Sequence, residues 1–158
     1  MAKKQKVNSG ALLLATALEA EGATGHFADV VRSIYQQESG SGANTTTSNQ
    51  GAVGGAQIIP STFAAVADRD WNINDPLQNL RAGIRYAKQG YDKSGGDPAL
   101  TGAFYYGGPG GMEKAKQGIA VYDLKNPNAP STLQYGQQIA NRVGKTVPTG
   151  VPSTSAVD

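Results

Sequence analysis

The chain has 158 residues, 39% of them hydrophobic and 16% charged, and a formal net charge of +2 at pH 7. This length and composition fit one globular domain. The lack of cysteine excludes disulfides and zinc–thiolate sites, and the small net charge gives no indication of nucleic acid binding. The one histidine is His26, and no apolar stretch approaches ~20 residues, so we expect no metal site, no organic cofactor and no membrane-spanning helix.

The first predicted helix starts at Ser9, because a serine ahead of an apolar run is a good N-cap. Three lysines near the start of the chain and the apolar run 11–18 resemble a signal peptide, but the run is short and two glutamates follow it closely. We therefore expect an amphipathic helix within an N-terminal segment of residues 1–22, followed by a domain of residues 23–143.

The stretch from Phe27 to Glu38 has the clearest helical pattern. Its apolar residues recur at i, i+3, i+4, i+7 and i+8, which is one face of an α-helix; they are Phe27, Val30, Val31, Ile34 and Tyr35. Glu38 continues this series, so its carboxylate is expected to project from the apolar face in the last turn, beside a cleft. The alternative is a last-turn glutamate that lies in solvent.

Two Asp-Pro pairs predict the starts of two further core helices. Asp75 and Asp97 each offer an N-cap acceptor, and the prolines that follow fit the first helical position. These helices are expected to run for about 12 and about 9 residues. Ser61 is expected to cap another helix, and Ser131 to cap a last helix that ends at Val143.

The glycine-rich stretches 40–55 and 90–111 are interpreted as loops between helices. Residues 53–59 are compatible with a short strand or hairpin. The segment 144–158 is rich in Pro, Ser, Thr and Val, which predicts a disordered tail. The sequence thus predicts a mainly α, compact helical domain with a glycine-rich loop or short β-hairpin.

Four blocks of sequence resemble, in the same order, motifs of the SLT-type lytic transglycosylase family. The first is the Glu-Ser pair formed by Glu38 and Ser39. The others are 48–62, similar to S-x-x-G-A-x-G-L-M-Q-I-x-P-x-T; 75–86, similar to D-P-x-x-N-I-x-A-G-x-x-Y; and 103–110, similar to A-A-Y-N-A-G-P-G. Each block alone is weak, whereas four blocks in order are specific.

The resemblance implies a lysozyme-like α+β fold and an enzyme that cleaves the MurNAc-β-1,4-GlcNAc bond of peptidoglycan, forming 1,6-anhydroMurNAc. Glu38 would be the catalytic residue, because a glycosidic oxygen needs a proton donor and burial on an apolar face raises a carboxyl pKa. Ser39, Gln57, Tyr105 and Tyr135 match cleft residues of the family and are expected to bind substrate. The two tyrosines are also compatible with a place in the core.

Two departures from the family pattern leave alternatives open. Gly55 and Ala56 replace a Leu-Met pair, which would remove an apolar wall, and Tyr106 replaces an asparagine. One alternative is therefore a non-catalytic glycan-binding virion or injection component, and another is a hydrolytic muramidase on the same fold. Most glycosidases use a second carboxylate, and no obvious partner for Glu38 appears. The nearest candidates in chain order after Glu38 are Asp68, Asp70 and Asp75.

The sequence contains no convincing signal peptide, so a wall-degrading enzyme of this kind must be carried to its substrate. Small domains that resemble this one are common in phage particles and secretion machines. We therefore expect a phage-encoded, virion-associated protein that acts on the bacterial periplasm and cell wall; the alternative is a secreted or periplasmic protein. The expected partners are peptidoglycan glycan strands and other virion or secretion-machine proteins.

Overall fold

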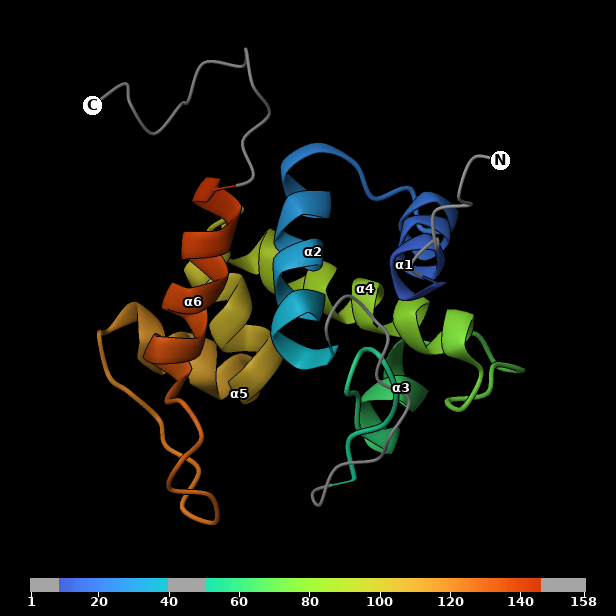
Figure 1. Ribbon diagram of the computed structural model, residues 1–158. Helices are drawn as coiled ribbons and strands as arrows, with labels where there is room; N and C mark the ends of the chain where they lie inside the picture. The colour runs from blue at the N-terminus through green and yellow to red at the C-terminus, as the bar shows by residue number, and fades with distance from the viewer. Residues whose placement is uncertain (1–8, 40–50, 146–158) are drawn as a thin grey trace, which may run out of the picture.

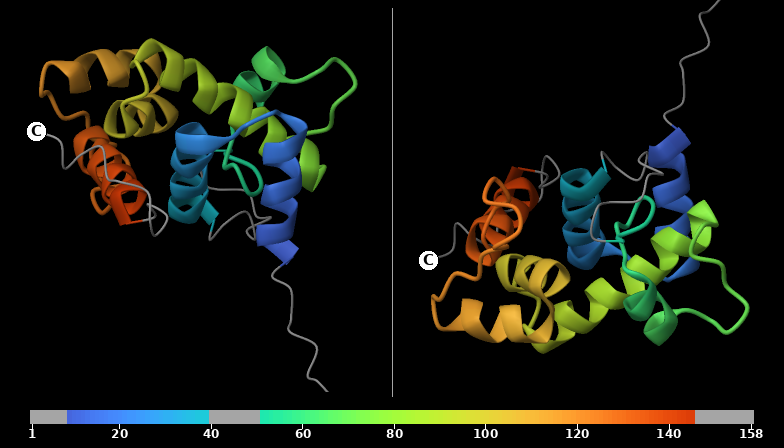
Figure 2. Two further views of the ribbon diagram at one scale, coloured as in Figure 1. Left: turned by 90° about the horizontal axis from the view of Figure 1, so that it is seen from above. Right: turned by 90° about the horizontal axis from the view of Figure 1, so that it is seen from below.

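The computed structural model describes residues 9–39 and 51–145, and six helices lie within these two stretches. They are α1 (Ser9–Ala20), α2 (Gly25–Ser39), α3 (Pro60–Val66), α4 (Pro76–Lys93), α5 (Pro98–Lys116) and α6 (Thr132–Lys145). Helix α2 lies between α1 and α6, and α4 runs across behind it (Figures 1 and 2). The prediction of a mainly α fold is confirmed.

The apolar face of α2 forms the centre of the core. All five of its predicted apolar residues are buried: Phe27, Val30, Val31, Ile34 and Tyr35. Burying a large apolar side chain contributes about 1.5–3 kcal/mol relative to leaving it exposed, so this face fixes the position of the whole helix. On the other side of α2, Arg32 is exposed and pairs with Asp29 at 3.1 Å. The last turn of α2 is thereby held at the edge of the core.

Both Asp-Pro helix starts are confirmed. The carboxylates of Asp75 and Asp97 each accept a hydrogen bond from the backbone N–H three residues later, at 2.8 Å and 3.0 Å. The helices are longer than predicted, with 18 residues in α4 and 19 in α5. Helix α5 bends at Gly108, which has φ 71° and ψ −173° and precedes Pro109. A left-handed φ is open to glycine, so the chain turns there and then continues as helix.

The interpretation of residues 90–111 as a loop is wrong, because most of this stretch lies in α4 and α5. Its glycines allow helices to pack closely. A Cβ atom on Gly90 would lie 2.6 Å from the ring of Phe104, and one on Gly102 would lie 2.9 Å from Cγ1 of Ile139. Glycine content signals a loop only where the backbone itself needs the freedom, and at Gly90 and Gly102 the neighbouring side chains need the space instead.

The predicted serine N-cap of α6 is confirmed, whereas that of α3 is wrong. Ser61 does not cap α3: the helix begins at Pro60, the N-cap is Ile59, and no side chain bonds to the cap. Proline fits the first helical position because it has no N–H to satisfy. In α6 the prediction is confirmed, since Ser131 Oγ accepts from Gln134 N at 3.2 Å while the Gln134 side chain accepts from Ser131 N at 2.8 Å. Helix α6 continues to Lys145, past its predicted end.

A short hairpin precedes α3, as the sequence predicts. Val53 and Ile58 form an antiparallel bridge, with N···O distances of 2.9 Å and 3.2 Å. The buried Asn79 of α4 holds the hairpin from beneath. Its Nδ2 donates to Val53 O at 2.9 Å and to Ile73 O at 3.0 Å, and its Oδ1 accepts from Ala56 N at 2.9 Å. One side chain thus satisfies three backbone groups and fixes the hairpin on α4.

Helix α1 packs against α4, and its apolar residues Leu14, Ala17 and Leu18 belong to the same core as α2. The boundary between segments 1–22 and 23–143 stays a prediction. Residues 146–158 of the predicted tail lie outside the described residues. Within residues 9–39 and 51–145, no helix combines the length and apolar character needed to cross a membrane.

Candidate active site

A cleft of about 570 Å³ opens beside the last turn of α2. Its walls come from α2, the hairpin, α3, α4, α5 and the loop of residues 117–131 that joins α5 to α6. The described lining residues are Glu38, Ala52, Gln57, Ile58, Ile59, Thr62, Tyr86, Tyr105, Tyr106, Gly107, Gly108, Asp123, Asn126 and Ala129. Of these, Glu38 and Asp123 are the charged ones.

Glu38 is half-buried where the apolar face of α2 meets the cleft. Burial raises the pKa of its carboxyl above the usual value, because a charged carboxylate is poorly solvated there. The hydroxyl of Tyr135 donates to Oε1 of Glu38 at 2.7 Å and acts in the opposite direction, lowering the pKa. Burial is the larger effect, so Glu38 keeps its proton to higher pH than an exposed glutamate does.

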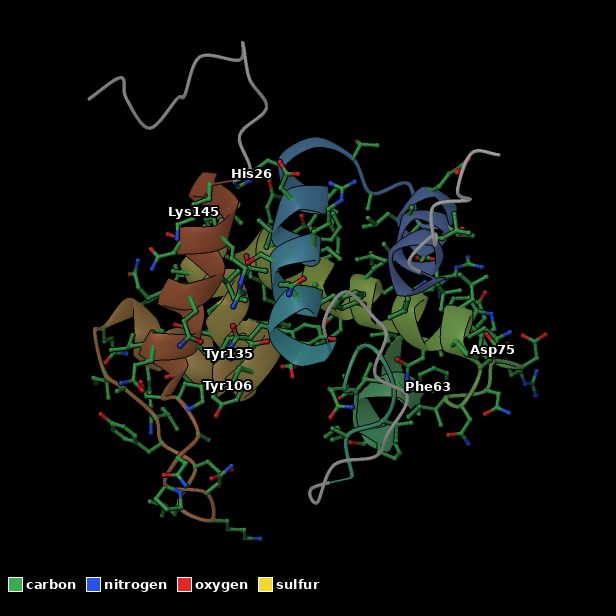
Figure 3. The ribbon with its side chains drawn as sticks, viewed as in Figure 1. His26, Phe63, Asp75, Tyr106, Tyr135 and Lys145 are labelled. Carbon is green, nitrogen blue, oxygen red and sulfur yellow. The ribbon has the colours of Figure 1, made fainter. Side chains whose placement is uncertain are left out.

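Tyr135, in the first turn of α6, lies behind Glu38 and is not among the residues that line the cleft. Its side chain is 2% exposed, and burial raises the pKa of its hydroxyl, so it stays protonated as a donor. The ring of Tyr106 stacks on it face to face, with 4.5 Å between ring centroids and 7° between ring planes. The two rings lie between α6 and the end of α2 (Figure 3).

Tyr105 connects α5 to the hairpin. Its hydroxyl donates to Ala56 O at 2.6 Å, and its ring meets that of Tyr35 edge-on at 6.4 Å between centroids. Ala56 is fully buried and does not line the cleft. Gly55 is buried as well, so neither residue lines the cleft, and the loss of an apolar wall at this pair stays a prediction. A larger residue at position 56 would meet α4.

Gln57 lies at the turn of the hairpin and lines the cleft. It has the left-handed backbone value of φ 48°, and its Nε2 donates to Gly54 O at 2.8 Å. The side-chain amide thus stabilises the loop, and the residue also lines the cleft. Gly54 has no room for a side chain, since a Cβ atom there would lie 2.7 Å from Asn79.

The three acids that follow Glu38 in the sequence lie away from the cleft. Asp68 accepts from Arg85 at 2.8 Å, which lowers the pKa of its carboxyl, and Asp75 caps α4. Asp70 is exposed in the turn that follows α3. None of the three is among the described residues that line the cleft.

Asp123 is the acid that shares the cleft with Glu38, and sequence reasoning missed it. It lies in the loop 117–131, where its Oδ1 accepts from Lys125 N at 2.9 Å. Together with burial and Glu38, it raises the pKa of the Tyr106 hydroxyl between them. Nothing in its neighbouring sequence distinguishes it from an ordinary turn aspartate. Only the packing of the loop against α5 brings it to the cleft.

Two residues considered in the sequence analysis, Ser39 and His26, remain to be placed. The side chain of Ser39 lies outside the described residues. His26 is exposed at the opposite end of α2 from Glu38, with its Nδ1 2.9 Å from the hydroxyl of Tyr91 (Figure 3). In the described part of the chain, no three His, Cys, Asp or Glu side chains gather as metal ligands would.

Comparison with known proteins agrees with this architecture. The chain resembles a crystal structure of an inactive mutant of the lytic transglycosylase Slt from Pseudomonas aeruginosa, with a TM-score of 0.64 and 20% identity over 85% of the chain. The match spans 23% of the length of that larger protein. It establishes the lysozyme-like fold. The sequence also matches the family described as Transglycosylase SLT domain over residues 15–126, which is most of its length. The chain therefore belongs to the SLT transglycosylase domain family.

Proposed function

We propose that this domain is a peptidoglycan lytic transglycosylase that cleaves the MurNAc-β-1,4-GlcNAc bond and leaves a 1,6-anhydroMurNAc end. The observation that carries the proposal is the half-buried Glu38 at the cleft, with a raised pKa and a hydroxyl donor at 2.7 Å. Membership of the SLT transglycosylase domain family supports it. The two kinds of support differ, because one is a local geometry around Glu38 and the other is a sequence match over residues 15–126.

The first step needs an acid that is protonated near neutral pH. A glycosidic oxygen is a poor leaving group until it receives a proton, and an ordinary glutamate has lost its proton at that pH. Burial raises the pKa of Glu38 and thereby increases the protonated fraction. Glu38 then transfers its proton to the bridging oxygen, the bond from that oxygen to C1 of MurNAc breaks, and the GlcNAc unit leaves.

The second step uses the same carboxylate as a base. The acetamido carbonyl of the MurNAc ring stabilises the positive charge at C1, so the reaction needs no second carboxylate. Glu38, now ionised, takes the proton from the C6 hydroxyl as that oxygen attacks C1 and closes the 1,6-anhydro ring. This returns Glu38 to its protonated form without consuming water. The hydrogen bond from Tyr135 stabilises the carboxylate in the interval between the two steps.

The cleft has the lining that a sugar polymer requires. The rings of Tyr86 and Tyr105 offer surfaces on which the apolar faces of sugars pack. The amides of Gln57 and Asn126 provide both donors and acceptors for hydroxyl and acetamido groups. We propose that Gln57 and Tyr105 contact the glycan directly; Ser39 stays a predicted substrate-binding residue.

The test is the digestion of purified cell wall by the wild type and by Glu38→Gln. Wild-type protein is expected to release anhydro-ended muropeptides, and the glutamine variant to lose about 100-fold or more of that rate, because an amide cannot transfer the proton. Glu113→Gln is the matched control, since Glu113 is exposed and pairs with Lys116 away from the cleft. Equal release by Glu38→Gln would disprove the role of Glu38. Binding of the wild type to wall without any release would favour the non-catalytic alternative.

A hydrolytic muramidase is the second candidate, because Asp123 gives the cleft a second carboxylate. Many glycosidases use such a residue as nucleophile or base. The two candidates differ in their products. Mass spectrometry of the released fragments finds anhydro ends for a transglycosylase and ends heavier by one water for a hydrolase.

We further propose that the domain acts locally on the wall as part of a phage particle or secretion assembly. Two large apolar side chains exposed on the loop 117–131 support contact with another protein, since Ile119 is 48% exposed and Leu124 94%. Antibodies raised against this chain are expected to label purified virions. Labelling of the periplasm of uninfected cells, with none on virions, would contradict this placement and favour a bacterial enzyme.

A further inference from the structure

Tyr106 packs against Tyr135, the residue whose hydroxyl is hydrogen-bonded to Glu38. Its own ring lies flat on Tyr135, with the centroids 4.5 Å apart and the planes 7° from parallel. The hydroxyl of Tyr135 is bound to Glu38 Oε1 at 2.7 Å. A ring covered across one whole face has little freedom to tilt. The direction in which Tyr135 presents its hydroxyl therefore depends on the position of Tyr106.

The far end of Tyr106 is also fixed. Its hydroxyl donates to Pro130 O at 2.7 Å. Pro130 immediately precedes Ser131, the cap residue of α6, and Tyr135 lies in the first turn of that helix. Tyr106 thus contacts α6 twice, through its ring on Tyr135 and through its hydroxyl on the backbone just before the helix. Two contacts to one helix start restrict both the rotation of the Tyr106 ring and the position of that start.

The direct contact of Tyr106 with substrate is the competing role, because Tyr106 lines the cleft. The two roles predict different kinetic effects. A residue that contacts sugar equally in the ground state and the transition state changes KM, whereas a residue that aligns the acid changes kcat. Tyr106 is half-exposed, so replacing it leaves most of the core untouched.

We propose that Tyr106 is a positioning residue for Glu38: it fixes the Tyr135 ring from α5, so that the Tyr135 hydroxyl stays on the carboxylate during both proton transfers. This rests on the proposed function, in which Glu38 is the acid and the base. Tyr106 acts here through Tyr135 and not by touching the reacting atoms.

The experiment is a double-mutant cycle with Tyr106→Leu, Tyr135→Phe and the double variant, assayed on purified wall. Tyr106→Leu is expected to lower kcat about tenfold with little change in KM, and to lower it less than about twofold when Tyr135 is already Phe. Tyr106→Phe keeps the stacked ring and is expected to retain kcat within about threefold. If Tyr106→Leu lowered kcat by the same factor with and without Tyr135→Phe, or raised KM alone, the proposal would be overturned.

Tyr122→Leu is the matched control, since Tyr122 is 62% exposed on the neighbouring loop and does not line the cleft. It is expected to leave kcat unchanged. Melting temperatures identify any variant that unfolds at the assay temperature. If Tyr106→Leu does so, Tyr106→Met replaces it, because the flexible methionine side chain fills irregular space and also lacks a flat ring.

Titration of the Glu38 carboxyl carbon by NMR tests the same proposal without turnover, and so separates it from the proposed function. The Tyr135 hydroxyl lowers the pKa of Glu38. Tyr106→Leu is expected to weaken the hydrogen bond from Tyr135 and so to raise the pKa of Glu38. The rise is expected to be larger in the wild-type background than in the Tyr135→Phe background. Equal shifts in the two backgrounds would overturn the proposal, whether or not the wild type cleaves wall.

Discussion

At the scale of single residues, Glu38 shows two opposing effects on one carboxyl group. Burial favours its neutral form, and the hydrogen bond from Tyr135 favours its charged form. A residue that is acid in one step and base in the next needs both. The neutral form must be populated at the start, and the charged form must be stable enough to persist until the second proton arrives.

This balance predicts a shift in the pH dependence of Tyr135→Phe. The proposed mechanism requires protonated Glu38, so kcat is expected to fall as the pH rises through the pKa of Glu38. Removal of the hydroxyl takes away a bond to the charged form and raises the pKa. The alkaline limb of the kcat profile is therefore expected to move to higher pH by about one unit, while the maximum kcat falls.

The profile is measured with wild type and variant on the same wall preparation. An alkaline limb that stays in place, or moves to lower pH, would contradict the assignment of the Tyr135 hydroxyl to the carboxylate. Tyr122→Phe serves as the control, because its hydroxyl is exposed and lies outside the cleft lining.

The sequence was sufficient to place Glu38 on the apolar face of α2, but not to place Tyr106 and Asp123 around it. Glu38 follows from local periodicity, since the five buried apolar residues of α2 define the face to which it belongs. The stack of Tyr106 on Tyr135 and the place of Asp123 depend on how α5, α6 and their connecting loop pack. Those contacts join residues far apart in the chain, and no spacing rule encodes them.

At the scale of elements, the hairpin is held by α4 and α5 together. Asn79 binds its backbone from α4, and Tyr105 binds Ala56 O from α5. Gly83 of α4 lies where these groups meet. A Cβ atom there would lie 2.6 Å from that of Ala56, 2.8 Å from the Tyr105 hydroxyl and closer still to the Tyr35 hydroxyl. These tyrosine hydroxyls are committed to backbone carbonyls and cannot move freely.

Gly83→Ala is therefore expected to destabilise the fold by about 1–3 kcal/mol and to lower activity, because the hairpin that carries Gln57 is displaced. Gly144→Ala is the matched control. Gly144 is also helical, and a Cβ atom there meets nothing within 4 Å. Its replacement is expected to raise stability by about 0.5–1 kcal/mol, since alanine favours helix. Urea unfolding measures both, and equal effects would show that space around Gly83 is not limiting.

The sequence predicted the start of a helix correctly where the start depends on a hydrogen bond between residues close together in the chain. The N-caps at Asp75, Asp97 and Ser131 are predicted by side-chain hydrogen bonds within one turn. The signals failed where tertiary packing decides. Glycines between positions 90 and 111 indicated a loop, yet a Cβ atom on Gly90 of α4 or Gly102 of α5 would meet neighbouring side chains in the core. The failure at Ser61 has another cause, because Pro60 starts the helix without any side-chain cap.

At the scale of the whole molecule, one carboxylate ties α1 to the rest of the domain. Glu21, just after α1, accepts from Arg81 and Arg85 of α4 at 2.7 Å each, and its side chain is 10% exposed. Both arginines also lie over the ring of Trp71, at 4.7 Å and 4.2 Å from its centroid. Arg85 reaches Asp68 in the same segment. The network thereby connects α1, α4 and the segment between α3 and α4.

Glu21→Gln is expected to lower the free energy of unfolding by about 2 kcal/mol, because two partly buried guanidinium groups lose their shared charge partner. Asp92→Asn is the matched control. It breaks the exposed pair with Lys88, whose two side chains are 52% and 60% exposed, and is expected to cost less than about 0.5 kcal/mol. The free energies come from urea titrations at one salt concentration. A cost for Glu21→Gln no larger than the control would show that α1 is held by apolar contacts alone.

Two hydrogen bonds join Val121 of the loop 117–131 to Thr132, the first residue of α6. Val121 N donates to Thr132 Oγ1 at 3.0 Å, and Thr132 N donates to Val121 O at 2.9 Å. Residues 122–131 therefore form a loop whose two ends are held together by hydrogen bonds. Insertions between these ends add little closure entropy and do not displace the flanking helices. Grafting segments of other lengths and compositions there is a route to new glycan preferences, while Glu38 stays on its own rigid scaffold.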